Sequence, residues 1–235
     1  MIDNKKVLGL VIARGGSKGL PGKNLMKLGG KPLVCHSVEA GLNSKYIDNV
    51  IISTDDKAIA EAAKKCGCKV PFMRPAELAT DSAKSIDVIK YTLETLIDNG
   101  EIYDYFVLLQ PTTPFRNAGH IDECLRMLSD RDADSVVSVT EAEHHPLWMN
   151  ELPDDMSMSG FIRPEAENKN RQDLPKHYRL NGGVYAVRCS YMLSTMKLYS
   201  DRSYAYLMDN ESSIDIDNEL DFEFANLIFQ KRESK

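Results

Sequence analysis

The stretch that decides the fold is Val7-Leu8-Gly9-Leu10-Val11-Ile12, followed at once by Ala13-Arg14-Gly15-Gly16-Ser17-Lys18-Gly19-Leu20-Pro21-Gly22-Lys23-Asn24. The first part is a continuous apolar run, which is typical of a parallel strand buried on both faces. The second part therefore leaves the carboxyl edge of a parallel sheet, where open α/β folds bind ligands. Its glycines let backbone N–H groups approach an anion closely, and Arg14, Lys18 and Lys23 add positive charge. The loop predicts a site for a polyphosphate.

The loop matches neither of two common nucleotide-binding signatures. A Walker loop needs a glycine, four further residues and then Gly-Lys-Ser/Thr, but this chain has Ser17 at the first position and Asn24 after Lys23. A dinucleotide fingerprint needs glycines at positions one, three and six, which the loop lacks. The alternative is a flexible, solvated basic turn. We favour a binding loop, because loops that open at strand ends are disproportionately functional.

Length and composition favour one large α/β domain. The chain has 235 residues, which is enough for a well-filled core but not for two full domains. A formal net charge of −6 argues against a general nucleic-acid binder. Apolar stretches stay well short of the ~20 residues of a membrane span, and residues 1–6 lead directly into a strand instead of a signal peptide. We therefore expect a cytoplasmic protein that binds neither nucleic acid nor membrane.

The cysteines are Cys35, Cys66, Cys68, Cys124 and Cys189. We expect them to be reduced core residues, because they are odd in number and scattered through predicted helices and loops. Only Cys66 and Cys68 are closely spaced, and one intervening residue without a second pair is a weak signal for zinc.

Strand-like and helix-like segments alternate along the first 140 residues, which predicts an α/β fold with a mostly parallel sheet and helices on both faces. Predicted strands cover residues 7–13, 49–53, 69–72, 105–109 and 135–140. Predicted helices cover residues 32–43, 57–66, 82–98 and 118–129. Beyond residue 180 we expect strands at 183–187 and near 205–208, an extended segment at 213–217 and a final helix at 219–231.

The alternation breaks at residues 141–180. This segment is polar and rich in proline, so it cannot bury much apolar surface by itself. It could be a lid, a disordered insertion or an arm that packs on a second subunit. We favour the arm, because the segment leads into the strand expected at 183–187. Residues 1–235 are then a single domain that carries 141–180 as a protruding arm for dimerisation and substrate binding.

A second candidate site lies in Ser213-Ile214-Asp215-Ile216-Asp217. Side chains two positions apart in an extended segment share a face, so Asp215 and Asp217 lie together, about 6–7 Å apart along the backbone. The two isoleucines then face the core. Two parallel carboxylates repel each other unless a cation lies between them, and hard oxygen ligands of this kind suit magnesium. The next residue, Asn218, is a good helix cap that fixes the pair at a strand-to-helix junction.

Three alternatives to a magnesium site at this aspartate pair are weaker. Asp217 could only cap a helix, Asp215 could only be exposed, and Asp-Ile-Asp could open a calcium loop. The calcium loop requires glycine at position 220 and glutamate at position 226, where this chain has Leu220 and Asn226. Magnesium commonly bridges carboxylates and phosphate oxygens, so the basic loop and the carboxylate pair predict one magnesium–polyphosphate site.

Seven blocks in order along the chain carry a family resemblance. They are Arg14 through Asn24; Arg74-Pro75-Ala76-Glu77-Leu78-Ala79 with Asp81; Leu109-Gln110-Pro111-Thr112-Thr113-Pro114; His144-His145-Pro146; Arg171-Gln172 with Leu174-Pro175; Arg179 with Asn181-Gly182; and residues 213–217. This set resembles the acylneuraminate cytidylyltransferases (CMP-sialic acid synthetases). The resemblance implies a single Rossmann-like sheet of the nucleotide-diphospho-sugar transferase type. It also implies transfer of CMP from CTP to the anomeric 2-hydroxyl of a nonulosonic acid, such as N-acylneuraminate or legionaminate, with release of pyrophosphate.

The resemblance also implies roles for individual residues. The nucleotide-binding positions would be Arg14, Gly16, Ser17, Lys18, Lys23, Asn24, Arg74, Ala83 and Ser85. The positions that hold the sugar acid would be Gln110, Arg171 and Arg179, and an arginine fork suits a carboxylate. The catalytic residues would be Arg14, Lys23 and Asp217, with Asp215 and Asp217 as ligands of Mg²⁺. The base stays open: the metal could ease ionisation of the attacking hydroxyl, or Asp217 could take the proton.

The choice of sugar and the class of enzyme leave alternatives. Trp148 stands where the family often carries a lysine, and it favours a less polar pocket wall unless it is a core residue. Pseudaminate and ketodeoxyoctonate therefore remain alternative acceptors. A metal-dependent glycosyltransferase is less favoured, because its Asp-x-Asp motif usually lies mid-domain. A non-catalytic nucleotide-binding module would tolerate loss of the metal ligands, which are present. By resemblance we expect a homodimer whose arms reach into the neighbouring site.

Overall fold

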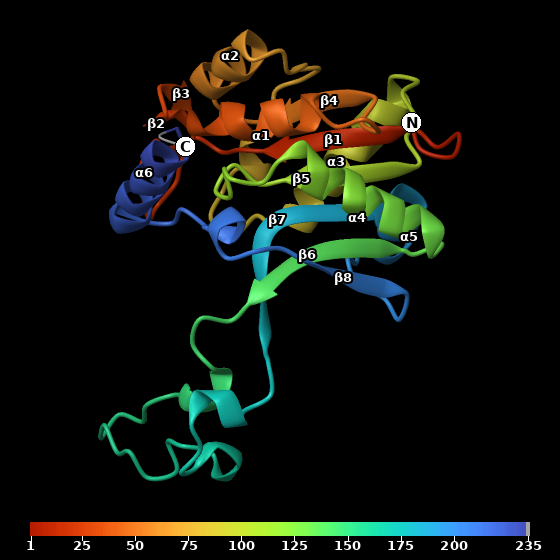
Figure 1. Cartoon of the computed structure of the whole chain (residues 1–235). Helices are drawn as coiled ribbons and strands as arrows, with labels where there is room; N and C mark the ends of the chain where they lie inside the picture. The colour runs from red at the N-terminus through yellow and green to blue at the C-terminus, as the bar shows by residue number, and fades with distance from the viewer. Residues whose placement is uncertain (234–235) are drawn as a thin grey trace.

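The computed structural model describes residues 1–233 and is built on a six-stranded sheet in the order β4-β1-β5-β7-β6-β8 (Figure 1). The strands are β1 (Val7–Ile12), β4 (Asn49–Ser53), β5 (Tyr105–Leu109), β6 (Ser135–Glu141), β7 (Tyr178–Arg188) and β8 (Ser203–Leu207). β1 pairs in parallel with β4 and β5, and β6 pairs in parallel with β8. Only β7 is antiparallel to its neighbours, β5 and β6. The predicted α/β class with a mostly parallel sheet is confirmed.

Helices cover both faces of the sheet. One face packs against α1 (Leu33–Leu42), α2 (Lys57–Lys65) and α4 (Ala118–Asp130), and the other packs against α3 (Ser85–Asp98) and α5 (Cys189–Thr195). Alternate residues of β1 serve the two faces: Val7 and Val11 join the first cluster, and Leu8 and Leu10 join the second. Because both faces are buried, the strand has to be apolar at every position.

The C-terminal helix α6 (Glu219–Glu233) completes a third apolar cluster beside the sheet. It packs near the hairpin of β2 (Lys27–Leu28) and β3 (Lys31–Pro32), with Phe222, Leu28 and Ile216 in the cluster. Short 3₁₀ helices occur at η1 (Lys23–Leu25), η2 (Ala76–Leu78), η3 (Pro146–Trp148), η4 (Pro164–Ala166), η5 (Arg171–Asp173) and η6 (Glu211–Ser213). The cluster fixes the segment that precedes α6 against the body of the protein.

Several predicted elements differ from the structure. The strand expected at 69–72 is wrong: only Lys69 forms a bridge, with Ile51, and Pro71 has no N–H to extend a ladder. Of the extended segment expected at 213–217, Ser213 belongs to the end of η6, and residues 214–217 join no strand; the Ile216 N–H donates to the Thr112 carbonyl at 2.9 Å. Neither α5 nor the β2–β3 hairpin was expected from the sequence.

The cysteine prediction is wrong for one pair. Cys35 of α1 and Cys66, at the end of α2, form a disulfide with their Cα atoms 5.8 Å apart. The two helices pack against the same face of the sheet, which brings together thiols that are 31 positions apart in sequence. The remaining cysteines are free and buried, as expected for core residues: Cys68, Cys124 and Cys189. Burial raises the pKa of all three thiols.

Residues 142–177 leave the end of β6 and return to the start of β7, and Figure 1 shows them extending away from the sheet. The segment is mostly exposed and holds η3, η4 and η5. Large apolar side chains lie open on it, among them Met149, Met156, Met158 and Ile162. A role of this protruding segment in dimerisation remains a prediction. Within residues 1–233, every helix is too short or too polar to cross a membrane.

Candidate active site

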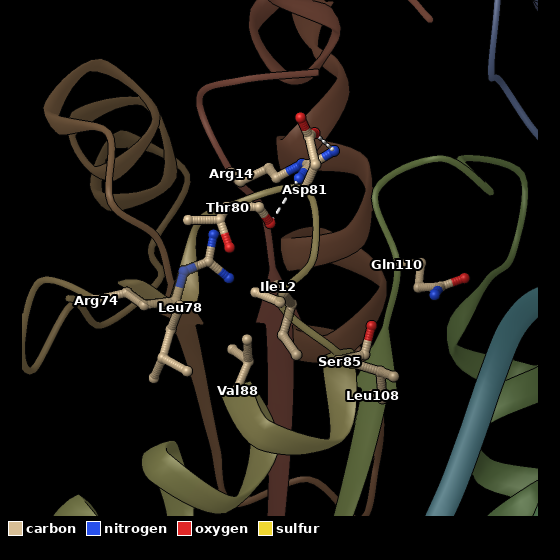
Figure 2. Close-up of a pocket in the computed structure, with 11 residues that line it drawn as sticks. Ile12, Arg14, Arg74, Leu78, Thr80, Asp81, Ser85, Val88, Leu108 and Gln110 are labelled. Atoms are coloured by element: carbon tan, nitrogen blue, oxygen red, sulfur yellow. Dashed lines mark hydrogen bonds and ion pairs between the residues drawn. The ribbon is translucent and has the colours of Figure 1, made fainter. Parts of the chain in front are cut away.

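Two adjoining cavities open at the carboxyl edge of β1 and β5. The first cavity has a volume of about 260 Å³, and Figure 2 shows Arg14, Arg74 and Gln110 around it. Ala83 and Ser85, at the start of α3, also line it. The cavity therefore gathers five positions that the sequence assigned to nucleotide or sugar binding. Its lining is mixed, because apolar side chains such as Ile12, Val88 and Leu108 lie beside the cations Arg14 and Arg74.

The second cavity, of about 370 Å³, lies over the basic loop. The predicted site residues that line it are Arg14, Ser17, Lys18, Lys23, Asn24, Gln110 and Asp217. Arg14 and Gln110 line both cavities, so the two volumes share a border. Gly16 lines neither, and a Cβ on it would meet nothing within 4 Å. An elongated ligand can thus span both cavities along the cationic loop.

The basic loop is held at its two ends. The N–H of Gly15 donates to Asp55 Oδ1 at 3.2 Å, and the Asn24 amide donates to the Arg14 carbonyl at 3.0 Å. Asn24 is only 5% exposed, so it fixes the loop from within the protein. Between these anchors Ser17 is half-buried and Lys18 is exposed to solvent. The loop has a fixed base and an exposed crest, which suits the capture of a charged ligand.

The front of the chain meets its tail at this site. Lys23 Nζ donates to the carbonyl of Ile216 at 2.8 Å and lies 3.1 Å from Asp217 Oδ1. Gly19 packs so closely that a Cβ there would lie 2.4 Å from the Asp217 carbonyl oxygen. Gly19 therefore has to be glycine for the basic loop to reach the acidic segment. Cations and carboxylates that are far apart in the sequence converge at one place.

Asp215 has a carboxylate oxygen whose surroundings suit a cation. Its Oδ1 atom is buried and has no hydrogen-bond partner. Burial raises the pKa of Asp215, and the neighbouring Asp217 carboxylate raises it further, whereas Thr112 and Lys23 act in the opposite direction. A buried carboxylate oxygen without a donor, beside a second carboxylate, fits a divalent cation. No group of three or more His, Cys, Asp or Glu side chains gathers within residues 1–233, so a cation here would need oxygens from a ligand as well.

Arg74 is the buried cation of the first cavity. It is 4% exposed, and its Nη2 atom lies 3.2 Å from Asp55 Oδ1. Its Nε–H is buried without an acceptor. Burial lowers the pKa of Arg74, and the hydrogen bond to Asp55 opposes that shift. Arg74 lines the first cavity, and its unused donor calls for an acceptor, because an unsatisfied buried donor is destabilising.

The residues predicted to hold a sugar acid are not gathered in one place. Gln110 lies at the border of the two cavities. Arg179 forms a two-pronged ion pair with Glu143 at 2.9 and 2.8 Å, and it lies close enough to Asp215 for each charge to stabilise the other. Arg171 lies on the protruding segment, donates to the Ala142 carbonyl at 3.5 Å and lines neither cavity. Within one chain, Arg171 is therefore remote from the site.

Trp148 also lies outside both cavities. It ends η3 at the root of the protruding segment, where its ring centroid is 6.0 Å from that of His145. His145 is 7% exposed; its Nδ1 accepts from the N–H of Leu147, and its Nε2 is bonded to the Pro175 carbonyl. These contacts give the histidine a structural role.

Two residues that support the site were not identified from the sequence. Asp55 joins the basic loop to Arg74, and its place directly after β4, at the same edge as the loop, was an available signal. Arg116 is 3% exposed, and its N–H groups make five hydrogen bonds to neutral oxygens, on Ser37, Gln110, Thr113 and Gly183. We call these residues the Arg116 cage. Nothing local in the sequence marks a buried arginine of this kind.

A mostly parallel sheet whose carboxyl edge joins a cation-lined cavity to a carboxylate pair places the chain among α/β proteins with a candidate site for a phosphorylated ligand. A family model described as cytidylyltransferase matches residues 8–232. The chain belongs to the cytidylyltransferase family.

Curated relatives fall into several acceptor classes. The chain is 37% identical to the N-acylneuraminate cytidylyltransferase of Escherichia coli, over 97% of this chain and 53% of that protein. The CMP-N,N'-diacetyllegionaminic acid synthase of Legionella pneumophila is 34% identical, over 92% of this chain and 93% of that protein. The pseudaminic acid cytidylyltransferase of Campylobacter jejuni is 31% identical, over 96% and 97%. The chain spans about half the length of the N-acylneuraminate cytidylyltransferases that it matches.

A solved structure supports the fold. The CMP:2-keto-3-deoxy-manno-octonic acid synthetase complexed with CTP matches 97% of this chain and 99% of that chain, with a TM-score of 0.70 and 17% identity. The likeness extends over the whole sheet and its helices, and at this identity it bears on the fold alone.

Proposed function

We propose that this chain transfers CMP from CTP to the anomeric 2-hydroxyl of a nonulosonic acid, with release of pyrophosphate. The observation that carries the proposal is the contact of Lys23 with Ile216 and Asp217, which joins the cationic cavity to the carboxylate pair. A nucleotidyl transfer needs both parts, because the leaving pyrophosphate requires positive charge and the attacking hydroxyl requires activation. The cytidylyltransferase family match supports CTP as the donor.

Each of the two cavities would hold one part of CTP. The cytidine would occupy the first cavity, where the unused Nε–H of Arg74 meets an acceptor on the base or ribose and Ser85 lies at the start of α3. The triphosphate would lie in the second cavity against Ser17, Lys18 and Lys23. Arg14 lines both, so it is placed for the α-phosphate, where charge develops during transfer.

Asp215 and Asp217 fit Mg²⁺ on the donor chemistry described above, since one buried oxygen of Asp215 has no partner. When bound, the metal would neutralise phosphate charge and ease ionisation of the acceptor hydroxyl. Lys23 would hold Asp217 and, through the Ile216 carbonyl, the backbone of the segment in place. Asp217 is exposed on the cavity side and is the candidate for direct proton removal.

The acceptor would approach between Gln110 and Arg179. Arg171 is remote within one chain, and we propose that it serves the site of a second copy, carried there by residues 142–177. The exposed methionines and isoleucine of this segment support a homodimer, because such side chains on a protruding segment favour association. Sedimentation at micromolar concentrations tests the homodimer, and a monomer throughout that range contradicts it.

Pyrophosphate release is the direct test of the function. We expect release only with CTP, Mg²⁺ and a sugar acid together, and a panel of N-acylneuraminate, legionaminate, pseudaminate and ketodeoxyoctonate identifies the acceptor. Asp217→Ala should reduce turnover by roughly 10³-fold or more, because the site then loses a metal ligand. Asp98→Ala, an exposed carboxylate at the far end of α3, is the matched control. Full activity of Asp217→Ala in a folded protein would remove the metal role from this residue.

A further inference from the structure

The loop between η2 and α3 crosses the rim of the first cavity. Figure 2 shows Thr80 and Asp81 of this loop beside Arg14 at the cavity mouth. Arg14 Nη1 donates to the Thr80 carbonyl at 2.9 Å. The loop also makes a backbone turn, in which Ala83 donates to the same carbonyl at 3.2 Å. Backbone contacts thus already hold the loop against Arg14.

The Asp81 carboxylate bridges two cations of the basic loop. Its Oδ1 lies 2.9 Å from Arg14 Nη2, and its Oδ2 lies 2.8 Å from Lys18 Nζ. The hydrogen bond from Lys18 holds the pKa of Asp81 below its usual range, so the group is charged at neutral pH. One acid therefore occupies donors of two residues that the proposed function assigns to the triphosphate.

The two acids at this edge differ in how firmly they are held. Asp55 accepts from Arg74 and from the N–H of Gly15, and its side chain is 27% exposed. Asp81 forms ion pairs through its two carboxylate oxygens. Its side chain is 49% exposed, and the side chain of its partner Lys18 is 77% exposed. Exposed ion pairs of this kind are weak and screened by salt. Asp55 is built into the site, whereas Asp81 can be displaced.

We propose that Asp81 is a specificity-determining residue: its carboxylate competes with the ligand for Arg14 and Lys18, and it gives way only to a polyphosphate. The inference rests on the proposed triphosphate site. A triphosphate carries several negative charges and many acceptor oxygens, so it offers both cations more than one carboxylate does. A nucleoside without phosphates carries no negative charge to compete with the carboxylate, and it leaves the pair intact. As pyrophosphate departs, Asp81 can reclaim both side chains.

Asp81→Asn tests the competition, with Glu77→Gln as the matched control. Glu77 is exposed in the neighbouring η2 turn, so its substitution makes the same change in net charge. Isothermal titration at low ionic strength compares CTP, inorganic pyrophosphate and cytidine as ligands. We expect Asp81→Asn to bind CTP and pyrophosphate about three- to tenfold more tightly than the wild type, with cytidine unchanged, and salt to shrink the difference. Glu77→Gln should match the wild type.

The outcomes separate this inference from the function on which it rests. Equal or weaker binding of CTP by Asp81→Asn, in a wild type that does bind CTP, overturns the competition alone, and Asp81 then orients the cations or a metal. An equal gain in Glu77→Gln also overturns it, because the effect would be general charge. A wild type that binds neither CTP nor pyrophosphate overturns the proposed function and the inference together. Asp81→Ser, a second neutral variant, should reproduce the gain, and a failure to do so counts against competition by charge.

Discussion

Two loops leave the same edge of the sheet and are completed in opposite ways. The loop after β5 is completed by the protein, because Arg116 uses all five N–H groups on the neutral oxygens of its cage. The loop after β1 leaves its charges at the surface, where Lys18 is 77% exposed and Arg14 pairs with an acid on another loop. The protein itself supplies the partners of the cation in the first loop, whereas the cations of the second loop are open to a ligand.

This difference predicts whether a substitution in each loop will change mainly the stability of the protein or mainly its binding and reaction rate. A buried charge whose donors are all used cannot lose its side chain without leaving several oxygens unpaired. An exposed cation can be removed with little change in the free energy of unfolding, because water replaces its partners. Substitutions in the β5 loop should therefore change stability first, and substitutions in the β1 loop should change binding and rate first.

The largest effect on stability is expected from Arg116→Met, which keeps most of the volume and removes every donor of the cage. We expect the free energy of unfolding to fall by about 3–5 kcal/mol, because the Ser37 hydroxyl and the Gln110, Thr113 and Gly183 carbonyls each lose an N–H donor inside the protein. Urea unfolding measures the change. Arg126→Met, on the exposed surface of α4, is the control and should stay near the wild type. A loss below about 1 kcal/mol would mean that the cage is not required for the fold.

Arg14→Ala, in the loop after β1, is expected to change the reaction rate much more than the stability. We expect kcat to fall about 10²-fold, because a contact that is strongest as charge develops on the phosphate affects kcat more than KM. The free energy of unfolding should change by less than about 1 kcal/mol. Steady-state kinetics with CTP measures the split, and Arg126→Ala is the control. A change in KM alone would make Arg14 an anchor for bound CTP instead.

The smallest expected effect is an increase in stability, produced by a substitution at Asp215. Burial and the Asp217 carboxylate raise the pKa of Asp215, so the folded protein disfavours the ionised form of this group at neutral pH. Asp215→Asn removes that charge and should stabilise the metal-free protein by about 1 kcal/mol, while turnover is lost. Thermal unfolding without divalent cations measures the gain, with Asp98→Asn as the control. A less stable Asp215→Asn protein would indicate that the interactions of Asp215 with Thr112, Lys23 and Arg179 outweigh the cost of burying its charge.

The buried strands and the basic loop could be predicted from the sequence, because each has a local pattern. The strands at Asn49–Ser53 and Tyr105–Leu109 were predicted to the residue, because a strand buried on both faces is an uninterrupted apolar run. The basic loop was predicted because glycine and lysine are local signals. Its contact with residues 216 and 217 depends on tertiary packing, which local patterns only suggest.

Other features have no local signal. The placement of β7 between β5 and β6, antiparallel to both, depends on pairings between distant segments. The Arg116 cage and the Cys35–Cys66 disulfide depend on residues brought together from different elements. The end of a short strand, as at Lys69, is set by whether a neighbour offers a partner, and the apolar pattern alone does not record that.

The contact between Lys23 and Asp217 joins positions 194 apart along the chain. During translation at 5–20 residues per second, roughly 10–40 seconds separate the synthesis of these two residues. The basic loop is made early, yet it can meet its acidic counterpart only after Asp217 has been synthesised. Under the proposed function, a chain that stops before Asp215 could attract a polyphosphate through the basic loop but would lack the carboxylate pair that the reaction needs.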